Sequence, residues 1–225
     1  MPPPQRLPAT ERRRAGPVVK AAIVAADQAL AASGHEATAL ATVFTSATGE
    51  PSNCHALCES LATPERLLSP TRFTNSVHNA PGGYWHIASQ AMTASTSLAA
   101  FDGSFGAGLL EAATQALTSG QPVLAVCADV TYPAPLQALR PLADSAAVAL
   151  VVGPVHADPT GPRLRIRLVP EQADTSFGLP ELDRVVQGIP AARALPLLAA
   201  LARGEAAQVL VEGLPGHSLL VEVQP

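Results

Sequence analysis

The residues best placed for chemistry lie in the segment Asp102-Gly103-Ser104-Phe105-Gly106. If a helix begins here, its unpaired backbone N–H groups and its dipole favour negative charge at this point. Enzymes that transfer acyl groups often place a cysteine or a serine at such a position, where the N–H groups can bind an oxyanion. Asp102 is a good helix cap and a poor acyl nucleophile. A plain helix cap therefore explains Asp102 best.

The sequence around this segment predicts a strand, a sharp turn and a helix. Ser97 to Phe101 is a run of small and apolar residues, long enough for a buried strand and too short for a helix. Beyond the turn, apolar residues recur at helical intervals until Ser119-Gly120, where we expect the helix to end. The recurring residues are Phe105, Leu109, Leu110, Ala113 and Leu117.

A serine hydrolase or acyltransferase is an alternative interpretation of the same turn. Asp102 to Gly106 differs from the nucleophile-elbow pattern G-x-S-x-G only at its first glycine, which would make Ser104 the nucleophile. Such an enzyme needs a later acid followed by a base histidine. The serviceable candidates in that order are Asp158 or Asp183 as the acid and His217 as the base.

A second candidate region, Ser69 to Trp85, contains a tyrosine and the only tryptophan of the chain. Its prolines and paired glycines predict a loop that leads into a helix from about Gly83 to Met92. His78 and Asn79 could donate hydrogen bonds in a binding loop, or the segment could form a hydrogen-bonded interface.

The three cysteines do not indicate a metal site or a disulfide framework. Cys54 and Cys58 lack the C-x-x-C spacing of a zinc knuckle, and no second pair of ligands follows at a suitable distance. Their spacing fits one half-buried face of a helix with Leu57 and Leu61. We expect neither a metal nor a cofactor, and a reducing compartment.

Composition bounds the class of protein. Hydrophobic residues make up 48% of the 225 residues and charged residues only 14%, so we expect a partner to cover part of the surface. A net charge of −4 does not indicate the basic surface that binds nucleic acid. The sequence has no run of eighteen apolar residues, and its proline-rich start lacks the apolar region of a secretory signal. We therefore expect no membrane span and a cytoplasmic location.

The order of the elements predicts an α/β class. Residues 1–16 read as a basic, proline-rich and flexible lead, and residues 17–225 as a single domain. Helical patterns cover 17–33, 53–61 and 194–203, the second capped by Ser52 or Asn53. Strand patterns cover 38–45, 123–127, 146–152, 164–169, 208–212 and 218–223, and the 164–169 strand has one wet face.

The stretch SLAAFDGSFGAGLLEAATQALTSGQPVLAVCADV resembles the N-terminal half of β-ketoacyl synthases, the condensing enzymes of fatty acid and polyketide assembly. TALATVFTSATGE and SPTRFTNSVHNAPGGYW are similar to an early strand and the dimer-edge loop of that half. The resemblance spans about 17–152. It is strongest to compact ketosynthase-like proteins of bacterial aryl polyene and related pigment pathways. It implies a thiolase-like half, layered αβα with a mixed sheet, truncated relative to a full condensing enzyme.

The resemblance also implies a role without catalysis. The position of the family's nucleophilic cysteine holds Asp102, or Gly103 if the register slips by one. His156 and His217 do not match the histidine motifs of a full enzyme. The expected protein is a chain-length-factor-like subunit, inactive alone, that forms a heterodimer with a full-length β-ketoacyl-ACP synthase and meets acyl carrier protein only indirectly. A scaffold without acyl contact is the remaining alternative. The residues expected at the acyl tunnel or interface are Asn75, His78, Asn79, Tyr84, Trp85, Phe101, Asp102 and Phe105.

Overall fold

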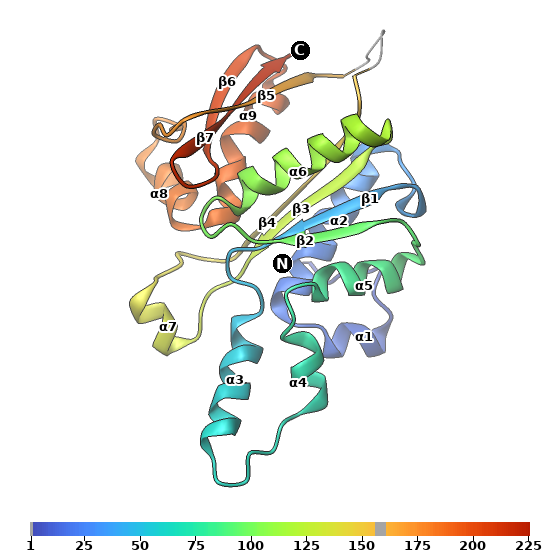
Figure 1. Ribbon diagram of the computed structural model, residues 1–225, viewed down its shortest axis with the longest axis vertical. Helices are drawn as coiled ribbons and strands as arrows, with labels where there is room; N and C mark the ends of the chain where they lie inside the picture. The colour runs from blue at the N-terminus through green and yellow to red at the C-terminus, as the bar shows by residue number, and fades with distance from the viewer. Residues whose placement is uncertain (1, 156–160) are drawn as a thin grey trace.

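The computed structural model describes residues 2–155 and 161–225 and contains two β-sheets (Figure 1). The first sheet has the order β2-β1-β3-β4, in which β1 is parallel to both of its neighbours and β4 is antiparallel to β3. The strands are β1 (Ala41–Thr45), β2 (Ser95–Leu98), β3 (Val123–Asp129) and β4 (Ala146–Val152). The sheet is therefore mixed, as predicted.

Helices cover both faces of this sheet. One face packs against α2 (Pro17–Ser33) and α5 (Ala80–Ser89), and the 3-10 turn η1 (Ala37–Ala39) leads from α2 into β1. The apolar stripe predicted for α2 is buried throughout, and the helix ends at Gly34, whose φ of 70° suits glycine. The opposite face packs against α6 (Ser104–Ser119), where Val43 and Val123 contact Ala112 and Ala116.

The second sheet lies beyond α6 and shares its core. It has the order β5-β7-β6, with β5 (Arg163–Pro170), β6 (Ala207–Glu212) and β7 (His217–Gln224) all antiparallel. Phe105 and Leu109 of α6 join Val148 of β4 and Leu219 of β7 in one apolar cluster. The helix α6 therefore lies between the two sheets, as Figure 1 shows. The helical segments α8 (Pro180–Gly188), η2 (Pro190–Ala194) and α9 (Leu195–Arg203) connect β5 to β6.

Helices α3 (Pro51–Ala62) and α4 (Pro70–Asn75) form an arm that projects from the body (Figure 1). The loop predicted within 69–85 is wrong, because α4 lies inside it, whereas the helix predicted from about Gly83 to Met92 exists as α5 but begins three residues earlier, at Ala80. Pro70 and Pro81 stand in the first turns of these helices, where a missing N–H costs nothing. The predicted Ser52 or Asn53 cap is also wrong, since Glu50 precedes α3 and no side chain caps it. A short helix α7 (Ala134–Leu139) follows β3.

The N-terminal lead, expected to be flexible, packs against the body. It forms α1 (Ala9–Arg14), and Leu7 is 2% exposed within the cluster that α2 and β3 build. The Arg6 guanidinium lies 5.0 Å from the centre of the Trp85 ring. Because these contacts are apolar and stacking contacts of single side chains, the basic, proline-rich composition of the segment did not reveal them.

Candidate functional site

The turn between β2 and α6 is a strained elbow. Phe101 has a φ of 51°, a left-handed conformation that is unusual for a bulky residue, and α6 begins three residues later at Ser104. The residue before the helix is Gly103, and no side chain caps this helix. The expectation that Asp102 caps α6 is therefore wrong. The tip of the elbow is Phe101, one residue before Asp102.

Two glycines of the elbow are required by close approach of the backbone. A Cβ atom on Gly103 would collide with the carbonyl oxygen of Gly213, and one on Gly106 with that of Glu212. The end of β6 and the turn after it are thus pressed against the start of α6. Gly103 and Gly106, the latter the one glycine of the nucleophile-elbow pattern, serve packing between α6 and the second sheet.

Ser104 does not present a nucleophile. Its side chain is fully buried, its hydroxyl donates to the Phe101 carbonyl at 2.7 Å, and the Ala100 N–H donates to its oxygen at 3.1 Å. Asp183 accepts hydrogen bonds from Ser176 and from the Phe177 N–H, and the exposed His217 ring lies 3.2 Å from the Pro215 carbonyl. Neither side chain makes a hydrogen bond to Ser104 in the described part of the chain.

Two further sequence candidates, His156 and Asp158, lie outside the described residues. Within residues 2–155 and 161–225, no group of three or more His, Cys, Asp and Glu side chains could hold a metal ion.

Asp102 belongs to a cluster of ion pairs over the elbow. One of its carboxylate oxygens pairs with Arg140, and the other lies 3.6 Å from Arg193. Arg193 is only 10% exposed and also pairs with Asp174, at 3.8 Å, and with Glu212. Burial raises the pKa of Asp174, and the neighbouring Arg193 partly opposes this shift. The cluster joins the elbow, the end of α7, the loop after β5, η2 and β6.

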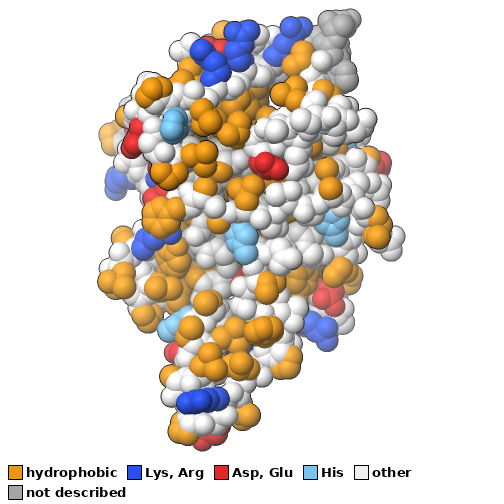
Figure 2. All heavy atoms as spheres, viewed as in Figure 1, with side chains coloured by type: hydrophobic (Ala, Val, Ile, Leu, Met, Phe, Trp, Pro, Cys, Tyr) orange, Lys and Arg blue, Asp and Glu red, His pale blue; other side chains and the backbone are white. Residues whose placement is uncertain are grey.

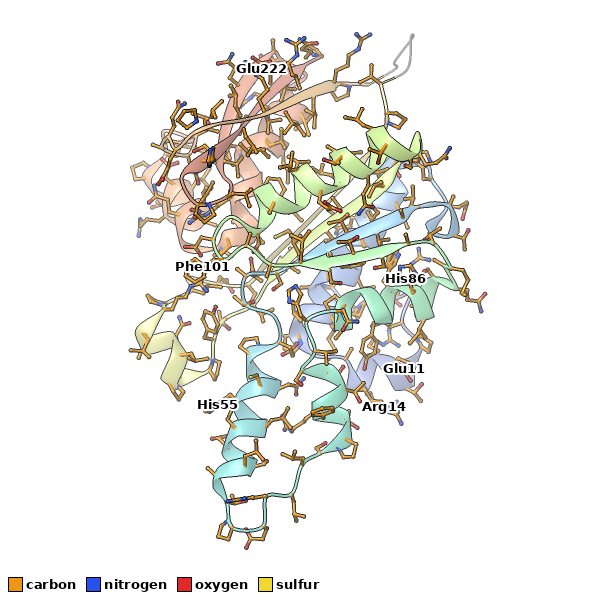
Figure 3. The ribbon with its side chains drawn as sticks, viewed as in Figure 1. Glu11, Arg14, His55, His86, Phe101 and Glu222 are labelled. Atoms are coloured by element: carbon orange, nitrogen blue, oxygen red, sulfur yellow. The ribbon has the colours of Figure 1, made fainter. Side chains whose placement is uncertain are left out.

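Arg140 also holds the ring of Phe101. Its guanidinium lies 3.7 Å from the centre of the Phe101 ring and donates a 2.7 Å hydrogen bond to the Tyr132 hydroxyl. Phe101 nevertheless remains 63% exposed. Figure 3 labels it between the start of α6 and the segment that carries α7. The tip of the elbow therefore presents an aromatic ring where an acyl-transfer enzyme would present a thiol or hydroxyl.

The cysteine thiols lie elsewhere. Cys127 is buried in β3, where burial and the nearby Asp129 raise the pKa of its thiol, so the thiol stays protonated. Cys54 and Cys58 are on α3 and are exposed, not half-buried as their spacing suggested. Since an acyl thioester needs an accessible thiolate at the elbow, the described residues give this site no means of forming one.

The residues predicted for a tunnel or interface fall into two groups. Asn75, Trp85 and Phe105 are buried within the chain, with Asn75 donating to the Arg14 and Thr71 carbonyls. The remaining members reach the surface wholly or in part: His78, Asn79, Tyr84, Phe101 and Asp102. Their contact with a partner remains a prediction.

One edge of the first sheet is open. Strand β2 pairs only with β1, so its other side has no strand neighbour among the described residues. The Ala94 carbonyl accepts from the Thr42 N–H at 3.0 Å, which fixes the side that faces β1. Since backbone groups alternate along a strand, those of Ser95 and Ser97 point away from β1. Such groups can pair with a strand of another chain.

Sequence reasoning missed Arg140 and Arg193, which complete the site. They lie 38 and 91 residues from Asp102, and neither stands in a motif. An arginine in a loop looks like any solvated charge until the fold brings it to a carboxylate. The aromatic tip was missed for a smaller reason, because Phe101 was counted as the last residue of the strand.

The family model described as beta-ketoacyl synthase, N-terminal domain, matches residues 1–211. The match extends well beyond the segment 17–152 that carried the sequence resemblance. No curated protein matches the chain. Within the described residues, no helix has the length and apolar character needed to cross a membrane.

Solved structures share the fold over nearly all of the chain. A chain from the ketosynthase ApeO in complex with its chain length factor ApeC, from Xenorhabdus doucetiae, is 24% identical with a TM-score of 0.72. The match covers 96% of this chain and 81% of that one. A chain of the ishigamide ketosynthase/chain length factor is 14% identical, with a TM-score of 0.71 and coverage of 100% and 85%.

A more distant likeness extends to a condensing enzyme of another kind. The 3-oxoacyl-[acyl-carrier-protein] synthase III of Aquifex aeolicus VF5 is 12% identical, with a TM-score of 0.56 and coverage of 92% and 84%. The mixed α/β architecture is thus the thiolase-like fold of ketosynthases. Together with the match over residues 1–211, this places the chain in the family of β-ketoacyl synthase N-terminal domains.

Proposed function

We propose that this protein is a non-catalytic, chain-length-factor-like subunit of a β-ketoacyl-ACP synthase. The observation that carries the proposal is the elbow itself, where Phe101 stands at the tip and Asp102 is held by Arg140 and Arg193. A condensing subunit needs a nucleophile at this point, and here it is replaced by a ring and an ion-paired carboxylate. The solved relatives named above include ketosynthase complexes with a chain length factor, which supports a ketosynthase as the partner.

The open edge of β2 suits the docking of such a partner. Its outward N–H and C=O groups can extend the sheet across a subunit boundary without any change in this chain. Two exposed apolar residues lie just before β2 in the chain: Ile87 on α5, and Met92 in the loop between α5 and β2. Burial of these side chains against a partner would remove apolar surface from water, which is the main driving force of most protein association.

The projecting arm offers a second apolar surface to the same partner. Leu61, Leu67 and Phe73 are 51%, 78% and 60% exposed on the arm, a large apolar exposure for so few residues. Figure 2 shows hydrophobic side chains gathered over this projecting part of the molecule. The arm and the edge of β2 together would shield the apolar surface that the composition predicted a partner to cover.

The proposal places the acyl chain at the partner's side of this boundary. His78 and Asn79 are exposed just before α5, and Tyr84 is half-buried on α5 itself. From there they can border a tunnel in the partner and so influence product length. The pathway we propose is fatty-acid or polyketide assembly of the aryl polyene type, in the cytoplasm, with acyl carrier protein delivering substrate to the active partner.

A condensation assay with three samples tests the proposal: this chain, the full-length ketosynthase encoded nearest to it, and the two co-purified. We expect no elongation product from this chain alone and elongated acyl product from the complex. Elongation by this chain alone would contradict the non-catalytic role, and a fluorophosphonate probe that labels Ser104 would favour the hydrolase instead.

A further inference from the structure

The ring of Phe101 is costly to keep where it is. The backbone has a φ of 51°, a left-handed conformation that a bulky side chain adopts only with strain. The ring is also 63% exposed to water, so the fold does not recover this cost by burying it. A glycine or asparagine would satisfy the turn with less strain. An apolar ring held in a strained conformation at the surface therefore points to a contact outside this chain.

The ring is held in place before any contact is made. The Arg140 guanidinium stacks on the ring at 3.7 Å from its centre, and Phe101 still remains 63% exposed. Arg140 is itself fixed by its ion pair with Asp102 and its hydrogen bond to Tyr132. A side chain that is already ordered loses little conformational freedom on binding, which favours affinity.

The position of the ring links it to the open sheet edge. Phe101 follows the end of β2 by three residues, so it lies close to the end of the edge along which a partner strand can pair. On its other side, Leu136 and Leu139 of α7 are 44% and 84% exposed beside Arg140. Aromatic and arginine side chains surrounded by weaker apolar contacts are typical of the residues that dominate binding at interfaces.

We infer that Phe101, positioned by Arg140, is the main anchor of this interface and inserts its exposed ring into an apolar pocket of the ketosynthase subunit that docks along β2. The inference rests on the proposed function and adds which side chain carries recognition. The partner must present an apolar pocket there without a cation, because the guanidinium already covers one face of the ring.

The test measures the Kd between the purified ketosynthase and variants of this chain. Phe101→Gly removes the ring and suits the positive φ, so a loss of binding does not come from a strained turn. We expect the Kd to rise by roughly thirtyfold or more, as for other dominant interface residues. Leu117→Ala is the control, since Leu117 is 68% exposed at the far end of α6. It should leave the Kd unchanged.

Arg140→Lys tests the positioning role. Lysine keeps the charge beside Asp102 but lacks the flat surface that orders the ring, so we expect a Kd between those of the wild type and Phe101→Gly. An unchanged Kd for Phe101→Gly, with tight binding by the wild type, would overturn the anchor and leave the proposed function standing. Altered product length at unchanged Kd would also overturn it, and would assign the ring to the acyl chain. If the wild-type chain does not bind the ketosynthase, both proposals fail.

Discussion

Asp129 shows how much one buried carboxylate does in this fold. It ends β3 and is fully buried. One oxygen accepts from the Ser46 hydroxyl and from the N–H groups of Ala47 and Thr48, and the other accepts from the Ala191 N–H at 2.8 Å. Four donors from two distant segments converge on a group that can only accept. The carboxylate thereby fixes the loop after β1 and the start of η2 against the sheet.

Asp129→Asn should destabilise the protein. The side-chain NH2 of the new asparagine would face backbone N–H groups that now donate to Asp129. Buried polar groups would then be left unpaired, at a cost of about 3 kcal/mol. Urea unfolding followed by circular dichroism measures the loss. Asp144→Asn is the matched control, because Asp144 is exposed and bonds only its neighbour, the Ser145 N–H. Equal stability of the two variants would contradict the role given to Asp129.

The raised pKa of the buried Glu50 side chain makes the stability of the protein depend on pH. Burial raises the pKa of this carboxyl above the usual 4.5, although one oxygen accepts from the Val18 N–H at 3.1 Å. The other oxygen has no hydrogen-bond partner within residues 2–155 and 161–225. The folded state therefore binds this proton more tightly than the unfolded state. Its stabilising contribution is present below the unfolded pKa and is lost as pH rises through the folded pKa.

Glu50→Gln removes the charge and keeps an acceptor for Val18. We expect the variant to gain free energy of unfolding relative to the wild type as pH rises from about 4.5, and the difference to level off above the folded pKa of Glu50. Chemical unfolding at several pH values measures this difference, with the exposed Glu205→Gln as control. A gain that is largest at pH 4 would contradict the direction assigned to Glu50.

Strand β2 is the element on which the proposed assembly depends. Ser97 points its N–H away from β1, so proline at this position removes a donor that the chain itself does not use. We expect Ser97→Pro to fold and to lose binding to the ketosynthase, as judged by co-purification. Ser97→Ala keeps the N–H and should bind like the wild type. Equal binding of both variants would contradict pairing along β2.

Two exposed cysteines of helix α3 can report whether a partner covers the arm. Cys54 and Cys58 are exposed, while Cys127 is buried with a raised thiol pKa. A maleimide should therefore label two thiols in the folded free chain and three after denaturation. If the arm contacts the partner, labelling of Cys54 and Cys58 will slow in the complex, as mass spectrometry can follow. Unchanged labelling rates would place the arm outside the interface.

Elements with a strong local pattern could be predicted from the sequence. Helix α2, with Pro17 at its start and Gly34 after its end, follows its apolar stripe, and β4 coincides with the apolar run 146–152. The prediction of a loop within 69–85 failed because Pro70 and Pro81, read as loop residues, stand in the first turns of helices. At the site, the strand, the turn and the helix could be predicted from the local sequence pattern. The ion pairs of Asp102 could not, because they depend on tertiary contacts with Arg140 and Arg193.

The molecule as a whole leaves several apolar or unpaired surfaces uncovered. Its two sheets share α6 and a single apolar cluster, so the interior is closed around the elbow. The edge of β2, the arm and Phe101 remain uncovered, in a chain with 14% charged residues and a mean hydropathy of +0.22. Apolar surface of this extent on a weakly charged protein favours association over a free monomer.

The native mass of this 23.0 kDa chain, co-expressed with the full-length ketosynthase encoded nearest to it, tests the central claim most directly. The account predicts a stable complex with one copy of each subunit. A well-behaved monomer that leaves the ketosynthase unbound would contradict it.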